Sequence, residues 1–160
     1  MREELATLGN GAHALAIQIL GNRDDAADAV HDAFAQALAR PQSWDRERGP
    51  LRPWFLRVVR NRCIDLLRRR RPAGGAVEEL AAPSAGPDAA LEALQRDRRL
   101  ERALAGLAPE QRQIVVLRDY SDLSYAEIAS VLDLAPGTVM SRLHRARLAL
   151  RKRLESDDDD

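Results

Sequence analysis

A chain of 160 residues has room for one ordinary domain or two small ones and excludes a large catalytic core. Alanine and leucine supply most of its 45% hydrophobic residues, aromatic residues make up only 4%, and no window approaches the apolar length of a membrane span. The formal net charge is zero, and one cysteine with three scattered histidines excludes a disulfide-stapled secreted domain and a zinc finger. This composition predicts an all-α protein. Because no leader segment opens the sequence, we expect it in the cytoplasm without direct membrane insertion.

Two helices are predicted within the first 40 residues. Apolar periodicity predicts the first over residues 12–20, ending at Gly21. The second begins at Asp24 or Asp25 and repeats apolar residues at i, i+3, i+4 and i+7. Residues 1–39 carry six acidic side chains against two basic ones, so we expect this second helix to have an acidic exposed side.

An arginine-rich loop and a third helix follow. Pro41 ends the second helix, Trp44 lies in the loop, and Pro53 is predicted to open the third helix at its first position. Residues 40–71 contain 11 arginines against three acids. Basic residues interleaved with aromatic rings suit single-stranded nucleic acid, because the charges bind the backbone and a ring stacks on an unpaired base. Trp54 falls on the apolar side that is expected to form the core, so Trp44 is the better candidate for stacking.

Acidic residues recur every four positions on the second helix, at Asp24, Asp28 and Asp32. They could belong to a metal or acid–base site, to a solvated face, or to a docking surface for a basic partner. The chain has no second ligand cluster, no phosphate-binding glycine loop, no Ser-His-Asp set and no Cys-His pair that would complete a catalytic site. We therefore expect no enzyme activity, metal, cofactor or small-molecule substrate, and we favour the docking surface.

A change of composition marks the boundary between two units. Residues 72–87 are dominated by proline, glycine, alanine and serine without apolar periodicity, which predicts a flexible linker. The linker separates an N-terminal unit over residues 1–71 from a C-terminal unit over residues 88–156. Four aspartates at 157–160 form an acidic tail, and their mutual repulsion predicts disorder.

The C-terminal unit contains the pattern of a helix-turn-helix. One helix is predicted from Asp88 and a second from Pro109. Ser124 and Glu127 then form a capping box ahead of an apolar run. A turn over residues 133–136 leads into a last helix that extends to about residue 154. Two short helices joined by a tight turn, the second strongly basic, predict a DNA-reading helix-turn-helix.

The last helix has one apolar side and one polar side. Residues 137–153 contain six basic residues and no acidic one. Hydroxyl groups near the start of a helix can reach phosphate. The guanidinium of an arginine farther along can donate two hydrogen bonds to a guanine edge. The candidate DNA-reading residues are Thr138, Ser141, Arg142 and Arg145. The alternative is a solvated basic face on an ordinary helical hairpin.

Three stretches of the chain resemble the extracytoplasmic-function (ECF) sigma factors, the small two-domain promoter-recognition subunits of bacterial RNA polymerase. Residues 24–34 resemble the helix that binds core polymerase, and residues 54–69 resemble the helix that melts promoters. Residues 123–129 followed by 137–147 resemble the helix-turn-helix that reads the −35 element. The order and spacing of the three stretches match the family, so the resemblance covers most of the chain outside the linker and the tail.

The resemblance implies a non-catalytic transcription-initiation subunit that directs core RNA polymerase to promoter DNA and is held inactive by an anti-sigma factor. Its contacts with the clamp helices of the largest polymerase subunit would come from Asp28, His31 and Asp32. The unwound −10 strand would be held by Trp44, Arg46, Arg48, Arg52, Arg60 and Asn61. The −35 element would be read by Thr138, Ser141, Arg142 and Arg145. Family members usually carry a further helix before the one near residue 12, and only some ten residues precede it here.

Two other functions compete with this one. A stand-alone helix-turn-helix regulator that binds duplex DNA as a dimer explains the C-terminal unit, but it leaves the Trp44 loop and the acidic helix without a role. An enzyme acting on nucleic acid, such as a recombinase, lacks its catalytic residues. Binding of promoter DNA by the chain alone, or only together with core polymerase, distinguishes the regulator from the sigma factor.

Overall fold

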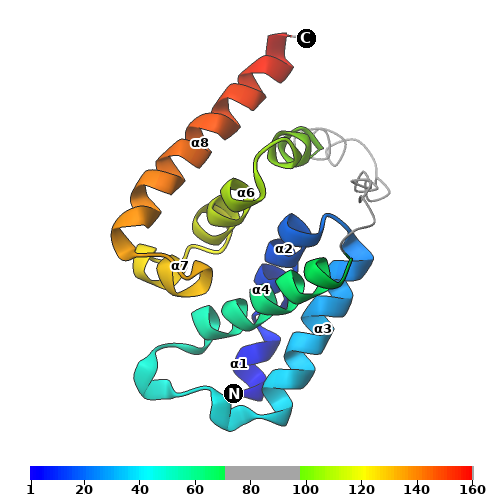
Figure 1. Ribbon diagram of the computed structural model, residues 1–160, viewed down its shortest axis with the longest axis vertical. Helices are drawn as coiled ribbons and strands as arrows, with labels where there is room; N and C mark the ends of the chain where they lie inside the picture. Colours follow the sequence, from blue (N-terminus) through cyan, green and yellow to red (C-terminus); the bar gives the residue numbers. More distant parts are fainter. Residues whose placement is uncertain (71–97, 160) are drawn as a thin grey trace.

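The computed structural model describes residues 1–70 and 98–159, and the regular structure within these ranges is entirely helical. Figure 1 shows an N-terminal unit in the lower part of the view and a C-terminal unit above it. The N-terminal elements are α1 (Arg2–Ala6), α2 (Gly9–Leu20), α3 (Arg23–Ala39), the short turns η1 (Pro41–Ser43) and η2 (Arg46–Arg48), and α4 (Leu51–Arg70). The C-terminal elements are a helix over 98–105, α6 (Pro109–Val115), η3 (Val116–Tyr120), α7 (Tyr125–Leu132) and α8 (Pro136–Asp159). The all-α prediction is confirmed.

Local signals define most helix ends in the N-terminal unit. Gly21 ends α2 in the left-handed region at φ 71°, which glycine adopts without a steric penalty. Asn22 caps α3, so that helix begins at Arg23, one or two residues earlier than predicted. Helix α4 begins at Leu51, so Pro53 lies in its first turn and not at its first position. The short helix α1 was not predicted from the sequence. Leu5 anchors it to the core, because this residue is only 1% exposed.

The C-terminal helices follow the predicted order. Helix α6 begins at Pro109 and runs into the π-helical turn η3, which the sequence did not indicate. The capping box at the start of α7 is confirmed: Glu127 N donates to Ser124 Oγ over 3.1 Å, and Ser124 N donates to a Glu127 carboxylate oxygen over 2.9 Å. The predicted linker and the predicted helix start at Asp88 lie outside the described residues.

The acidic tail was wrongly predicted to be disordered over its whole length. Helix α8 continues through Asp159. Once a helix is formed, each further residue adds one hydrogen bond without a new nucleation step. The preceding turns of α8 are well formed, and the hydroxyl of Ser156 donates to the Lys152 carbonyl over 2.9 Å.

Each unit has a buried apolar centre. In the N-terminal unit, α2, α3 and α4 pack against one another, and the rings of Phe34 and Phe55 meet with centroids 4.7 Å apart. Phe55 is fully buried, as its apolar periodicity predicts. In the C-terminal unit, α8 packs against α6 and α7 through Val139 and Leu143.

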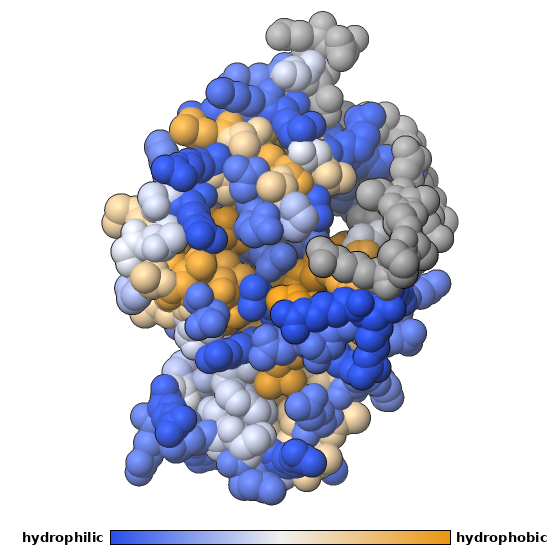
Figure 2. Space-filling view, viewed as in Figure 1, coloured by the Kyte–Doolittle hydropathy of each residue, from blue (hydrophilic) through white to orange (hydrophobic). Residues whose placement is uncertain are grey.

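The two units also pack against each other. Helix α7 lies against α4, and α2 contacts both α6 and η3. The buried apolar side chains of both units form one continuous cluster. In Figure 2, apolar residues gather in the middle of the molecule, around α7 and the part of α4 that faces it, with hydrophilic residues above and below.

Candidate nucleic-acid interface

Helices α7 and α8 and the turn between them form the predicted helix-turn-helix. Asp133 ends α7 in the left-handed conformation at φ 56°, and Leu134 N donates to the Ala129 carbonyl over 2.9 Å. These contacts fix the direction in which α8 leaves the turn. Val139, with Leu143 and Ala146 on the same side of α8, is buried, so the opposite side of the helix faces outward.

The four residues predicted to read duplex DNA lie along one side of α8. Ser141, Arg142 and Arg145 are exposed, and Thr138 is half-buried. The hydroxyl of Ser141 donates to the Thr138 carbonyl over 3.1 Å, so its oxygen can still accept a hydrogen bond. The structure therefore brings the predicted set together on a rigid helix that carries no acid between residues 137 and 153.

Two further exposed residues share this outward surface and were not singled out from the sequence. Met140 is 62% exposed, and His144 is exposed one turn farther along α8. His144 follows Ser141 by three residues, so the helical period places the two side by side. Met140 and His144 can be found from the sequence with a helical wheel that includes every exposed position of the helix, and not only its hydroxyl and arginine residues.

Other arginines of this unit contact residues of the same unit. Arg147 forms a two-pronged ion pair with Asp119, with Nε 3.1 Å from Oδ2, and Asp119 raises the pKa of Arg147. Arg118 lies over the ring of Tyr125, 5.2 Å from its centroid, and donates to the Leu123 carbonyl over 2.7 Å. These pairs join η3 to α7 and α8, so the two arginines hold the helix-turn-helix in place.

The loop predicted to hold single-stranded DNA is ordered by Trp44. The indole Nε1–H donates to the Gly49 carbonyl over 3.2 Å, and the side chain is half-buried against the core. The Arg46 guanidinium lies 5.2 Å from the centroid of the ring. Arg46 and Arg48 are both exposed. The loop thus presents one aromatic ring and two cations together.

The remaining three residues of the predicted −10 set point in different directions from α4. Asn61 is exposed, whereas Arg52 and Arg60 are half-buried. Burial lowers the pKa of Arg60, and the negative charge of Asp133 in the C-terminal unit opposes this shift. Arg52 lines a cavity together with residues of η3. The structure therefore does not bring all six predicted residues to one open surface.

The residues predicted to contact polymerase lie on one side of α3. Asp28, His31 and Asp32 are all exposed. Asp32 also accepts two hydrogen bonds from Arg62 of α4, from Nη2 over 3.0 Å and from Nε over 3.2 Å. This ion pair, which the sequence did not reveal, orients the Asp32 carboxylate and neutralises part of its charge.

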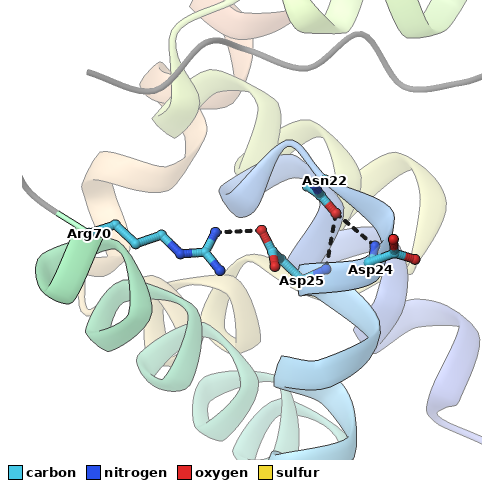
Figure 3. Close-up of polar contacts among 4 residues, drawn as sticks. All are labelled: Asn22, Asp24, Asp25 and Arg70. Atoms are coloured by element: carbon cyan, nitrogen blue, oxygen red, sulfur yellow. Dashed lines mark hydrogen bonds and ion pairs between the residues drawn. The ribbon is translucent and has the colours of Figure 1, made fainter. Parts of the chain in front are cut away.

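The start of α3 is fixed by polar contacts that Figure 3 shows together. The Asn22 side chain accepts from Asp24 N over 2.8 Å and from Asp25 N over 3.1 Å, which satisfies two free amides of the first turn. Arg70, at the end of α4, forms an ion pair with Asp25 and holds the pKa of that carboxyl below its usual range.

Replacing Asp25 by asparagine should lower the free energy of unfolding by at most about 1 kcal/mol at neutral pH, because the pair is partly exposed and screened by solvent. A lowered pKa in the folded state means that the contribution is complete above the pKa of the unfolded chain. It disappears as the pH falls through the lowered pKa of Asp25. Urea unfolding of both proteins across this range measures the difference. Asp24→Asn, which removes an exposed charge without an ion pair among the described residues, should show little of this pH dependence.

Cys63 is fully buried, and burial raises the pKa of its thiol to about 12, so it is not a nucleophile. Within residues 1–70 and 98–159, no group of three or more potential metal-ligating side chains comes together. No helix in these ranges is long and apolar enough to span a bilayer.

Comparison with known proteins identifies both units. Residues 6–73 match the family model for Sigma-70 region 2, and residues 97–150 match Sigma-70, region 4. The chain is 30% identical to the ECF RNA polymerase sigma factor SigW of Bacillus subtilis, over 89% of this chain and 82% of SigW. It is 35% identical to SigL of Mycobacterium tuberculosis, another ECF sigma factor, over 88% of this chain and 80% of SigL.

Solved structures agree with the sequence comparison. The sigma factor RpoE of Bartonella quintana, in complex with the anti-sigma factor NepR, matches with a TM-score of 0.81 at 28% identity and covers 98% of this chain and 97% of that one. CnrH, in complex with the cytosolic domain of CnrY, matches with a TM-score of 0.70 at 28% identity, over 97% of this chain and 87% of that one. The helix-turn-helix, the arginine-rich α4 and these relatives together place the chain in the family of ECF RNA polymerase sigma factors.

Proposed function

We propose that this sigma factor directs core RNA polymerase to its promoters through three separate surfaces. The exposed acidic side of α3 binds the clamp helices of the largest polymerase subunit, the Trp44 loop and α4 hold the unwound −10 strand, and α8 reads the −35 element. The polymerase-binding residues are Asp28, His31 and Asp32. The −10 residues are Trp44, Arg46, Arg48, Arg52, Arg60 and Asn61, and the −35 residues are Thr138, Ser141, Arg142 and Arg145.

The observation that carries the proposal is the outward side of α8. The capping box of α7 and the turn that follows fix the position of this helix. Its outward side carries the hydroxyls of Thr138 and Ser141 near the start and then the guanidinium groups of Arg142 and Arg145. Arginine binds the O6 and N7 atoms of guanine with two parallel hydrogen bonds, and backbone amides and hydroxyls near a helix start bind phosphate. The side chains therefore suit the major groove of duplex DNA.

The charges of the other two surfaces support their roles. Asp28 and Asp32 lie on the exposed side of α3 and suit a basic partner. In the loop, the Arg46 guanidinium lies over the Trp44 ring and Arg48 is exposed nearby in the sequence. Complementary charge speeds association and selects the partner. Sigma factors are not enzymes, so this chain acts by binding core polymerase and promoter DNA. It does so in the cytoplasm, where both are present. The complex of the related sigma factor RpoE with the anti-sigma factor NepR supports a further partner of this chain, an anti-sigma factor.

Transcription from genomic DNA with purified core polymerase tests the function directly. The chain should support initiation at a defined set of promoters, and Asp28→Lys should weaken its binding to core enzyme at least tenfold, about 1.4 kcal/mol. Glu110→Lys makes the same charge change on the exposed side of α6 and should leave core binding unchanged. Specific binding of promoter DNA by the chain alone, with no effect of core polymerase, would instead support a stand-alone regulator.

A further inference from the structure

We propose that a cavity beside α4 binds a small organic monocarboxylate with an apolar or aromatic body, and that Arg52 is the partner of the carboxylate. The cavity has a volume of about 300 Å³ and lies between the start of α2, the first turns of α4 and the end of η3. This volume is at the lower end of the range for small-molecule sites. The site belongs to the free chain, so it does not depend on the promoter contacts proposed above.

One cation lines the cavity. Arg52, in the first turn of α4, is half-buried and forms no hydrogen bond or ion pair with another described residue. None of the described residues in the cavity wall is acidic. A half-buried guanidinium has lost part of its hydration, so it gains more from a carboxylate than a fully exposed one does. Arg52 can therefore anchor a ligand carboxylate with two parallel hydrogen bonds.

A second polar group of the wall has no partner. Ser121 is 4% exposed, and its hydroxyl makes no hydrogen bond within the described structure. The Thr7 hydroxyl, by contrast, already donates to the Glu4 carbonyl over 2.7 Å. A buried polar group without a partner is unusual in a folded protein and carries a free-energy cost. Because Ser121 lines the cavity, rotation about its Cα–Cβ bond would let the hydroxyl donate to a bound ligand and remove this cost.

The rest of the wall is largely apolar and selects the body of the ligand. Leu56 is 1% exposed and forms the floor of the cavity, and Leu8 is half-buried. Tyr120 is 62% exposed, so it lies at the mouth. An apolar or aromatic body would bury surface against the leucines and contact the ring of the tyrosine.

The charge of the wall favours a monocarboxylate over other anions. A phosphate monoester carries close to two negative charges at neutral pH, and the single guanidinium of Arg52 balances only one of them. An unbalanced charge next to Leu8 and Leu56 is costly, because it is removed from water without a partner. An ion as small as acetate would leave the leucines uncovered. A carboxylate joined to a ring matches both parts of the wall.

Titration of the full chain with benzoate, followed by calorimetry, tests the site. Benzoate should bind with a dissociation constant in the submillimolar to millimolar range, as expected for so small a ligand. Benzamide has the ring without the charge, and acetate has the charge without the ring, so each should bind at least tenfold more weakly. Benzoate should also raise the midpoint of thermal unfolding, because a ligand that binds only the folded chain stabilises it.

Two arginine variants test the anion partner. Arg52→Gln should weaken benzoate binding at least tenfold. Arg57→Gln removes an exposed charge from the same helix outside the cavity wall and should leave the affinity unchanged. Because Arg52 has no partner among the described residues, its replacement should not lower the unfolding midpoint of the ligand-free chain.

Two further variants test the opposite wall and keep the fold. Ser121→Ala should weaken benzoate binding severalfold without lowering the unfolding midpoint of the ligand-free chain, since no hydrogen bond is lost. In Gly11→Ala the added Cβ would lie 3.4 Å from Ser121 Oγ and narrow the cavity, so benzoate should bind more weakly. Alanine is the better helix former, so this variant should fold at least as well as the original chain.

The titrations can overturn the proposal in three ways. Absence of benzoate binding at millimolar concentrations would overturn the site. Benzamide binding as tight as that of benzoate would overturn the role of Arg52 as the anion partner. Benzoate affinity that stays the same in Arg52→Gln, Ser121→Ala and Gly11→Ala would show that the ligand binds elsewhere on the chain.

Discussion

Replacing Trp44 by alanine should reduce the fraction of open complex on duplex promoters by up to about a hundredfold, because stacking of an unpaired base on an aromatic ring contributes about 1–3 kcal/mol. The structure adds a second role for this residue. Its Nε1–H donates to the Gly49 carbonyl over 3.2 Å, and Arg46 lies over its ring. Loss of the indole therefore removes a stacking surface and also an anchor of the loop.

Two measurements separate these roles of Trp44. Run-off transcription should fall sharply on a duplex template and recover much of the loss on a pre-melted template, where the cost of unpairing has already been met. Trp44→Phe keeps an aromatic ring but removes the hydrogen bond to Gly49, so it should retain much of the stacking and lose only the anchor. An equal loss on both templates would show that Trp44 serves the fold of the loop and not base stacking.

The features predicted correctly from the sequence are those whose causes are local. The capping box of Ser124 and Glu127 closes within four residues, and the end of α2 at Gly21 depends on the conformation of one residue. The apolar period of α8 likewise fixes which side is buried, since Val139 and Leu143 repeat every four positions. Such signals depend little on the rest of the fold, so pattern and propensity suffice to find them.

The features that were missed depend on residues far apart in the chain. The Asp32–Arg62 pair joins residues 30 positions apart, and the Arg112 contact with Gln18 joins residues 94 positions apart. The sequence indicates that an arginine is present but not whether it faces DNA or another part of the protein. For this reason Arg60 was assigned to an open surface, whereas the structure half-buries it on α4, the helix against which α7 packs.

The same distinction changes how the arginines of the C-terminal unit are interpreted. By composition alone, all the basic residues from 137 to 153 belong to one positive surface. In the structure, Arg147 is bound by Asp119, whereas Arg142 and Arg145 remain exposed on the outward side of α8. The Asp119 carboxylate neutralises part of the Arg147 charge and occupies two of its N–H donors, which weakens its contact with phosphate. The exposed arginines near the helix start are therefore the ones expected to read bases.

Arg142→Ala should weaken binding of the preferred −35 sequence by about 1–3 kcal/mol and relax base preference, because a two-pronged contact with a guanine edge distinguishes it from other bases. Arg151→Ala, farther along α8, should weaken all sequences alike by removing a phosphate contact and should reduce the salt dependence of binding. Both residues are exposed, so neither change should disturb the core.

Titration of holoenzyme against promoters with matched and scrambled −35 elements measures both effects. Arg147→Ala serves as the structural control, because it breaks the pair with Asp119 and should lower the stability of the helix-turn-helix more than it changes base preference. The ratio of affinities for matched and scrambled DNA should thus fall for Arg142→Ala and stay constant for Arg151→Ala. If the ratio stays constant for Arg142→Ala as well, this arginine binds the DNA backbone, and base reading passes to its exposed neighbours Ser141 and His144.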